Sequence, residues 1–200
     1  MKINKKQVIC MVIAVAMAWT VTALTIRAKE ARLQQNLAKE VFRFHVLANS
    51  DSDRDQALKM KVKENVISYM RKQLPKSNSV DMTKKWASTH LDEIKEVAES
   101  TLQEEQCLDK VKVKITNCYF PDKTYGDITF PKGNYDALRI EIGYAQGQNW
   151  WCVLYPNLCF VDAVHAIVPD EGKEELKEVL DEEEYDMITS KFKIKWFFFR

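Results

Sequence analysis

The chain has no excess of either charge: 30 lysines and arginines stand against 29 aspartates and glutamates among its 200 residues. The first 27 residues contain four of the basic side chains and none of the acidic ones. The rest of the chain is therefore slightly acidic. Proteins that hold nucleic acids or other polyanions by charge present a basic surface, so this balance argues against that class of function.

The sequence also lacks the local motifs of common hydrolases and of zinc sites. It contains neither G-x-S-x-G nor H-E-x-x-H, and no two cysteines are spaced as C-x-x-C. Its three histidines, His45, His90 and His165, are scattered, and only a pairing of His165 with Cys159 is conceivable as a nucleophilic site. Ordinary core or surface histidines explain this distribution more simply. We therefore predict no catalytic residue, no metal, no cofactor and no enzymatic activity.

An apolar run without charge, Val8–Ile26, follows a short basic N-terminus. As a helix rising about 1.5 Å per residue, it spans roughly 30 Å, the thickness of the hydrocarbon core of a bilayer. The lysines before it favour a cytoplasmic N-terminus and an exported remainder. We predict a signal peptide or a signal-anchor helix in residues 1–27, with cleavage left open. Residues 28–200 form one exported domain, since no Gly-, Pro- or Ser-rich linker divides them.

Cysteine usage is compatible with export. Cys10 lies inside the apolar run, which leaves an even number of cysteines in the exported part. The first candidate for a disulfide is Cys152–Cys159, which would close a small loop, and Cys107–Cys118 would be its companion. The alternative is that all four are free, buried thiols.

Helical periodicity dominates the first half of the exported part and strand alternation the second half. The predicted helices are 28–39, 54–74, 82–105 and 171–188, and the predicted strands are 41–48, 109–120, 135–144, 149–155 and 191–199. Strands that alternate apolar and polar residues form sheets with one face on the core. We predict an α+β fold: a mainly antiparallel sheet of four or five strands with helices packed on one face, preceded by the N-terminal hydrophobic helix.

The turn after the first strand, N-S-D-S-D-R-D, carries three alternating aspartates. Counted from Asp51 as a calcium loop, its sixth position is Gln56 and its twelfth is Val62, where a glycine and a glutamate are needed. This argues against calcium. Ser52 and Asp55 instead have the spacing of a capping box, with Ser50 and Asp53 as an alternative register, and acidic residues in the first turn complement the helix dipole. We predict a helix cap that a partner protein could also contact.

A second unusual stretch, G-Q-N-W-W-C-V-L-Y, contains two adjacent tryptophans. Neighbouring side chains in a strand point to opposite faces of the sheet, so one tryptophan can fill the core while the other lies on the outer side. Core packing alone is the alternative. The candidate partner-contact residues are Asn49, Ser50, Asp51, Asp53, Asp55, Trp150 and Trp151.

Three blocks of the sequence resemble the stage II sporulation protein R family in order and spacing. They are FRFHVLANSDSDRDQALKMKVKENV (residues 42–66), CYFPDKTYGDITFPKGNYDALRIEIG (residues 118–143) and GQNWWCVLYPNLCF (residues 147–160). The N-S-D-S turn and the N-W-W-C-V-L string are long and unusual, so the resemblance is specific.

The resemblance implies a signalling protein that is made in the forespore and exported into the space between forespore and mother cell. Its implied partner is a membrane-embedded aspartic protease of the mother cell, which processes the pro-form of sigma factor E. On this view the protein is a ligand and not a catalyst. The competing classes are an exported hydrolase or metal-dependent enzyme of the cell envelope and an anchored structural protein of the spore envelope.

Overall fold

The structure is a computed structural model that describes residues 4–75, 79–156 and 170–189. Its elements are α1 (Lys5–Glu40), β1 (Phe42–Leu47), α2 (Asp53–Gln73), α3 (Val80–Thr89), α4 (Leu91–Glu104), β2 (Val111–Phe120), β3 (Lys123–Tyr125), β4 (Ile128–Phe130), β5 (Gly133–Ile142), β6 (Asn149–Tyr155), α5 (Asp170–Val179) and α6 (Glu182–Thr189). The α+β class predicted from the sequence is confirmed.

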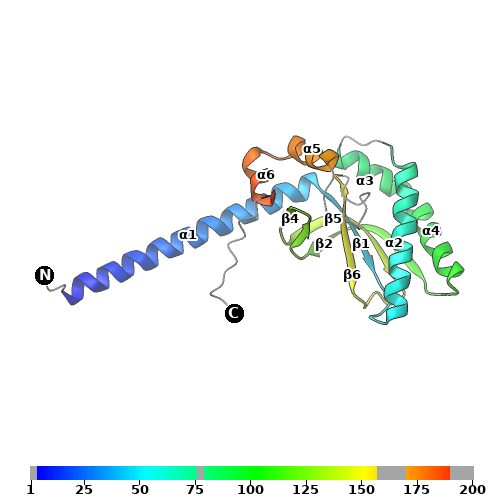
Figure 1. Ribbon diagram of the computed structural model, residues 1–200, viewed down its shortest axis with the longest axis horizontal. Coiled ribbons are helices and arrows are strands. Elements are labelled where there is room, and N and C mark those ends of the chain that lie inside the picture. The colour runs from blue at the N-terminus through cyan, green and yellow to red at the C-terminus, as the bar shows by residue number, and fades with distance from the viewer. Residues whose placement is uncertain (1–3, 76–78, 157–169, 190–200) are drawn as a thin grey trace.

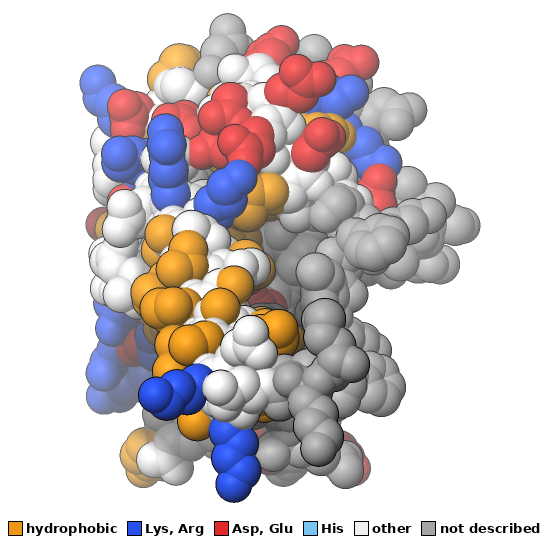
Figure 2. Space-filling view, turned by 90° about the vertical axis from the view of Figure 1, so that its left-hand side faces the viewer, with side chains coloured by type: hydrophobic (Ala, Val, Ile, Leu, Met, Phe, Trp, Pro, Cys, Tyr) orange, Lys and Arg blue, Asp and Glu red, His pale blue; other side chains and the backbone are white. Residues whose placement is uncertain are grey.

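Helix α1 is one continuous helix that projects from the domain (Figure 1). It is long and apolar enough to cross a membrane by length and composition, a test that a signal sequence also passes. Figure 2 shows the apolar side chains of its projecting part as one patch. The segment predicted as a separate helix at 28–39 is the end of the same helix, and its Leu33 and Leu37 are buried in the domain.

The four-stranded sheet has the order β2-β5-β1-β6. Two of its pairings are antiparallel, β2 with β5 and β1 with β6, as predicted for a mainly antiparallel sheet. The pairing of β1 with β5 is parallel. Parallel neighbours need a long crossover, and here three helices and three strands, α2–α4 and β2–β4, lie between the two strands in the chain. The change from helical to strand periodicity along the sequence thus predicts the sheet, but it does not predict the parallel pairing of β1 with β5 at its centre.

Both faces of the sheet are covered. Helices α2, α3 and α4 cover one face over a core that includes Phe44, Leu138 and Ile140. The other face packs against the end of α1, the β3–β4 hairpin and helices α5 and α6. Helices therefore lie on both faces, whereas helices on one face were predicted. The sequence pattern does not predict the helices on the face that packs against α1, because only part of that face is apolar.

Two predicted helices are each interrupted. The helix predicted at 82–105 is broken at His90 into α3 and α4, and the one at 171–188 is two helices, α5 and α6. At the first break, the Thr89 hydroxyl donates to the Trp86 carbonyl oxygen at 2.9 Å, and His90 Nδ1 lies 2.8 Å from the same oxygen. Such side-chain bonds compete with the helical backbone ladder. The hairpin β3–β4 was not predicted, and the strand predicted at 191–199 lies outside the described residues.

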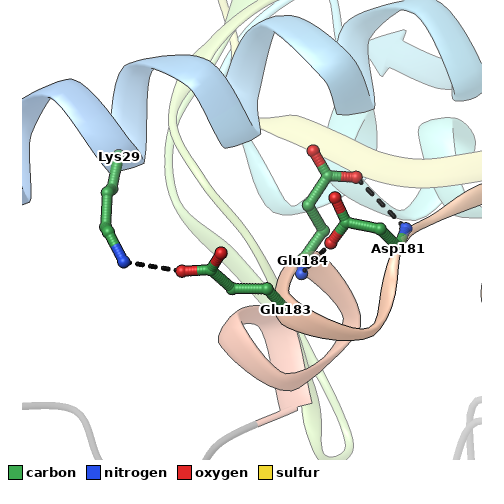
Figure 3. Close-up of polar contacts among 4 residues, drawn as sticks. All are labelled: Lys29, Asp181, Glu183 and Glu184. Atoms are coloured by element: carbon green, nitrogen blue, oxygen red, sulfur yellow. Dashed lines mark hydrogen bonds and ion pairs between the residues drawn. The ribbon is translucent and has the colours of Figure 1, made fainter.

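Helix α6 meets α1 close to the point where α1 leaves the domain (Figure 3). Lys29 Nζ lies 2.6 Å from a carboxylate oxygen of Glu183, and both side chains are exposed, so this ion pair adds little stability. Asp181 and Glu184 cap the start of α6, since the Glu184 amide donates to Asp181 Oδ1 at 2.8 Å. The base of α1 is thus fixed mainly by its buried leucines.

Replacing Leu37, which is fully buried, by alanine should lower the free energy of unfolding by about 2–4 kcal/mol because it leaves a cavity. Leu24→Ala on the exposed part of the same helix is the matched control and should leave it unchanged. Urea titration in detergent, followed by tryptophan fluorescence, measures both. Equal midpoints for the two variants would show that the end of α1 is not part of the domain core.

Candidate partner-binding site

The turn between β1 and α2 is organised around the carboxylate of Asp55. Asp55 Oδ2 accepts hydrogen bonds from Asn49 Nδ2 at 2.9 Å and from Ser50 Oγ at 2.5 Å. The Asp55 amide donates to Ser52 Oγ at 3.2 Å, so Ser52 is the N-cap, as predicted. The other half of the predicted capping box does not form, because the Ser52 amide donates to Ser50 Oγ at 3.2 Å instead of to the Asp55 carboxylate. The bond from Ser50, together with those from Asn49 and Ser52, lowers the pKa of Asp55 despite some desolvation. Asp55 is thus ionised and engaged inside the turn.

The same turn holds the loop between β5 and β6. Asn49 Oδ1 accepts from the Tyr144 amide at 2.9 Å, and Asp51 Oδ1 accepts from the Gln148 amide at 2.6 Å. The backbone continues this pairing, with the Gly147 amide donating to the Ala48 carbonyl oxygen at 3.0 Å. Asn49 and Asp51 therefore join two chain segments almost a hundred residues apart.

Two glycines allow this close approach. A Cβ at Gly147 would lie 2.1 Å from the carbonyl oxygen of Ser50, and one at Gly143 would lie 2.3 Å from Asn49 Oδ1. Gly143 also has a φ of +57°, in the left-handed region that favours glycine. A side chain at either position would separate the turn from the loop.

Lys59, on the buried side of α2, completes the network and was not predicted. Its Nζ donates to the carbonyl oxygen of Gln148 at 3.0 Å and to Gln56 Oε1 at 2.5 Å. Burial lowers the pKa of Lys59, and the charge of Asp51 opposes that shift. The sequence does contain one indication that Lys59 is buried: it lies beside Leu58 and close to Val62, which are on the buried face of the helix.

Asp53 differs from the other predicted contact residues of the turn. It is exposed at the first position of α2. Within residues 4–75, 79–156 and 170–189, no hydrogen bond or ion pair involves its carboxylate. Asn49, Ser50, Asp51 and Asp55 are all engaged inside the network. Asp53 is therefore the carboxylate of this turn that a partner can contact without disturbing the structure.

The two tryptophans point to opposite faces of the sheet, as predicted, and both are half-buried. Trp150 packs edge-on against Phe44, with 5.8 Å between ring centroids, and Lys63 Nζ lies 5.2 Å from its ring. Trp151 stacks on His45 at 3.8 Å. These contacts explain why each tryptophan is partly buried. Contact of either tryptophan with a partner protein stays a prediction.

The face that carries Trp151 also holds a fully buried arginine, Arg43. Its guanidinium carbon lies 4.2 Å from the ring centroid of Phe120, 5.0 Å from that of Tyr135 and 5.3 Å from that of Phe130. Nη2 donates to the Tyr125 hydroxyl at 3.1 Å. In the described part of the chain, its Nε and Nη1 have no hydrogen-bond partner.

His45 is buried beside this arginine. Burial, helped by the positive charge of Arg139, lowers the pKa of His45 to about 4. The imidazole is therefore neutral at pH 7 and serves as a flat surface for Trp151. Among the described residues, no group of three or more His, Cys, Asp or Glu side chains could hold a metal ion.

No disulfide joins any two cysteines in the part of the chain that the structure describes. Cys107, Cys118 and Cys152 are free thiols, and Cys159 lies outside the described residues. The pairing of Cys107 with Cys118 is wrong because Cys107 belongs to the core under α2–α4 and Cys118 packs against the core of the other face. Most of β2 separates them, at about 3.3 Å per residue, whereas a disulfide needs Cα atoms within about 7 Å.

Asp55→Ala should lower the free energy of unfolding by about 1–3 kcal/mol, because it removes a charged acceptor and leaves Asn49 and Ser50 without their partner. Asp53→Ala, two residues away and free of contacts, should cost no more than about 0.5 kcal/mol. Urea unfolding curves compare the two variants. A loss at Asp53 as large as that at Asp55 would contradict the engaged and unengaged roles assigned to them.

Stability should also depend on pH through His45. Its unfolded pKa is near 6.5 and its folded pKa about 4. The free energy of unfolding therefore has the full contribution of neutral His45 above pH 6.5, and it loses this contribution, about 3 kcal/mol, as pH falls to 4 and below. His45→Phe should flatten this part of the curve of unfolding free energy against pH.

His90→Phe is the control for that measurement, because His90 also stacks on a tryptophan, Trp86, at 4.4 Å. This variant should retain the pH dependence of the parent protein. An unchanged pH dependence in His45→Phe would show that groups other than His45 cause it.

Comparison of the sequence with known proteins finds a family match that includes the turn and the two tryptophans. The chain matches the family model described as Stage II sporulation protein R (spore_II_R) over residues 38–165. It is 32% identical over 182 residues to "Stage II sporulation protein R" of Bacillus subtilis (strain 168), which covers 87% of this chain and 80% of that protein. No solved structure matches the chain. The family match contains the turn, the loop it holds and both tryptophans.

Proposed function

This chain belongs to the stage II sporulation protein R family and has a role in sporulation, and we propose that it is an exported signalling protein that activates a membrane-embedded aspartic protease. That protease processes the pro-form of sigma factor E in the mother cell. The chain acts from the space between forespore and mother cell. The observation that carries the proposal is the family match over the turn and its network, together with an N-terminal helix suited to export.

The N-terminal helix supports export from the forespore. Its apolar part is exposed along its length, while Leu33 and Leu37 in its last turns are buried in the domain. With the basic N-terminus in the forespore cytoplasm, the domain lies on the other side of the forespore membrane. The helix thus serves as a signal or an anchor, and the domain faces the membrane of the mother cell.

Activation requires that the signalling protein bind the active arrangement of the protease better than the inactive one. A preorganised surface suits this task, because less binding energy is lost in ordering it. The hydrogen-bond network around Asp55 supplies such a surface. On this proposal Asp53 contacts the partner, while Asn49, Ser50, Asp51 and Asp55 fix the shape of the contact region. The half-buried Trp150 and Trp151 are further candidate contacts.

Co-expression of the full chain with the protease and the sigma precursor in a host that does not sporulate tests the function. Precursor cleavage, followed by immunoblot, should occur only when all three proteins are present. Asp53→Lys should reduce the cleavage rate by roughly tenfold, the effect of reversing one charge at an interface where like charges then meet.

Asp81→Lys is the matched control, since Asp81 is also an exposed acid in the first turn of a helix, α3. It should leave cleavage unchanged, and both variants should keep the export level and melting temperature of the parent protein. Absence of cleavage with the unmodified chain would refute the activation role. Normal cleavage with Asp53→Lys would limit the turn to a structural cap.

A further inference from the structure

Among the described residues of the domain, the two most exposed apolar side chains lie on neighbouring loops. Leu108 is 93% exposed and Tyr144 is 84% exposed, whereas Tyr119 and Met82 follow at 56% and 52%. Leu108 precedes β2, and Tyr144 follows β5, the antiparallel partner of β2. Scattered single apolar residues on a surface are ordinary, but these two lie at the same end of the sheet, next to the pair Val111 and Ile142.

The two loops are held firmly to the domain. The Gly143 amide donates to the Lys110 carbonyl oxygen at 2.9 Å, which joins one loop to the other. The Tyr144 amide donates to Asn49 Oδ1 at 2.9 Å. The turn network thus presents Tyr144 on a fixed backbone with its side chain in solvent, an arrangement that folding alone does not require.

Both loops also contain an unfavourable backbone conformation. Gln106 and Ala145 each have a φ of +54°, and within the described ranges no other residue besides glycine has a positive φ. Residues with a Cβ adopt the left-handed region reluctantly. Such positions persist where the surrounding structure imposes them. At Gln106 this conformation ends α4, since the Cys107 amide donates to the Leu102 carbonyl oxygen at 2.8 Å, and at Ala145 it closes a turn, since the Ala145 amide donates to the Ile142 carbonyl oxygen at 3.0 Å. These bonds fix the shape of the two loops.

The position of the loops relative to α1 limits what they can meet. Strand β1 begins directly after α1 and ends at the turn that holds Tyr144. In Figure 1 the turn, the start of α2 and the end of α4 lie on the side of the domain remote from the free end of α1. A membrane that contains Val8–Ile26 is therefore on the opposite side of the domain.

We propose that Leu108 and Tyr144, here called the distal surface, form the docking site for the extracytoplasmic part of the protease in the facing membrane. This inference rests on the proposed function and names the surface that carries it. The partner presents an apolar hollow that takes a leucine and a tyrosine side chain. Tyrosine is among the residues most enriched at binding hot spots, and the facing membrane is what the distal surface points toward.

A vesicle tethering assay tests this geometry with the full chain. The chain is reconstituted through α1 into phosphatidylethanolamine–phosphatidylglycerol vesicles, and acceptor vesicles contain the protease, the chain itself or no protein. Tethering should occur only with protease vesicles. The double variant Leu108→Ser, Tyr144→Ser should weaken it by roughly tenfold to thirtyfold, the range expected for truncating interface anchors.

The matched control is Met82→Ser, Tyr119→Ser, which removes two other exposed apolar side chains and should tether like the parent chain. Both double variants should keep the parent melting temperature, because the four side chains are mainly in solvent. Tethering of the double variant at the parent level would overturn the proposal. Equal tethering of protein-free vesicles, or of vesicles holding a second copy of the chain, would overturn it in favour of those occupants.

Precursor cleavage measured alongside tethering separates the two proposals. Tethering through the distal surface without cleavage would support docking and refute activation. Cleavage that persists in the double variant would support activation and refute docking at this surface.

Discussion

The guanidinium of Arg43 lies in the middle of the sheet, where the rings of Phe120, Phe130 and Tyr135 surround it. No carboxylate is paired with it in the described part of the chain, and a buried cation is costly unless other groups replace its hydration. The aromatic faces do this in part. Because the rings come from β2, β4 and β5, this interaction ties the small hairpin to the sheet, and the hairpin in turn helps enclose the core that receives the end of α1.

Strand β1 connects that core to the turn at its other end. All six of its residues are buried, so its alternation places Phe44 under the helices and Arg43 and His45 on the other face. The strand continues into Asn49 and Ser50, whose side chains fix Asp55 and the loop of Tyr144. The turn is therefore both the cap of α2 and the support of the loop beside it.

Local features of the sequence predicted much of this arrangement. Ser52 is the cap, the adjacent tryptophans lie on opposite faces, and an apolar N-terminal helix precedes an α+β domain. Long-range features were missed, because neither periodicity nor composition encodes which strands become neighbours. The parallel pairing of β1 with β5, the contact between Asn49 and Tyr144, and the separation of Cys107 from Cys118 all depend on that order. Buried Arg43 and Lys59 resemble surface residues in the sequence, and only their neighbours show otherwise.

The continuity of α1 into the domain gives the molecule a fixed reach. With Val8–Ile26 in a bilayer, the helix from Arg27 to Glu40 adds about 21 Å and β1 about 20 Å, so the turn stands at most roughly 40 Å from the membrane surface. A flexible tether would allow a wide range of separations. On the proposed function, a stem without a hinge would fix the distance from its own membrane at which an anchored chain presents the turn.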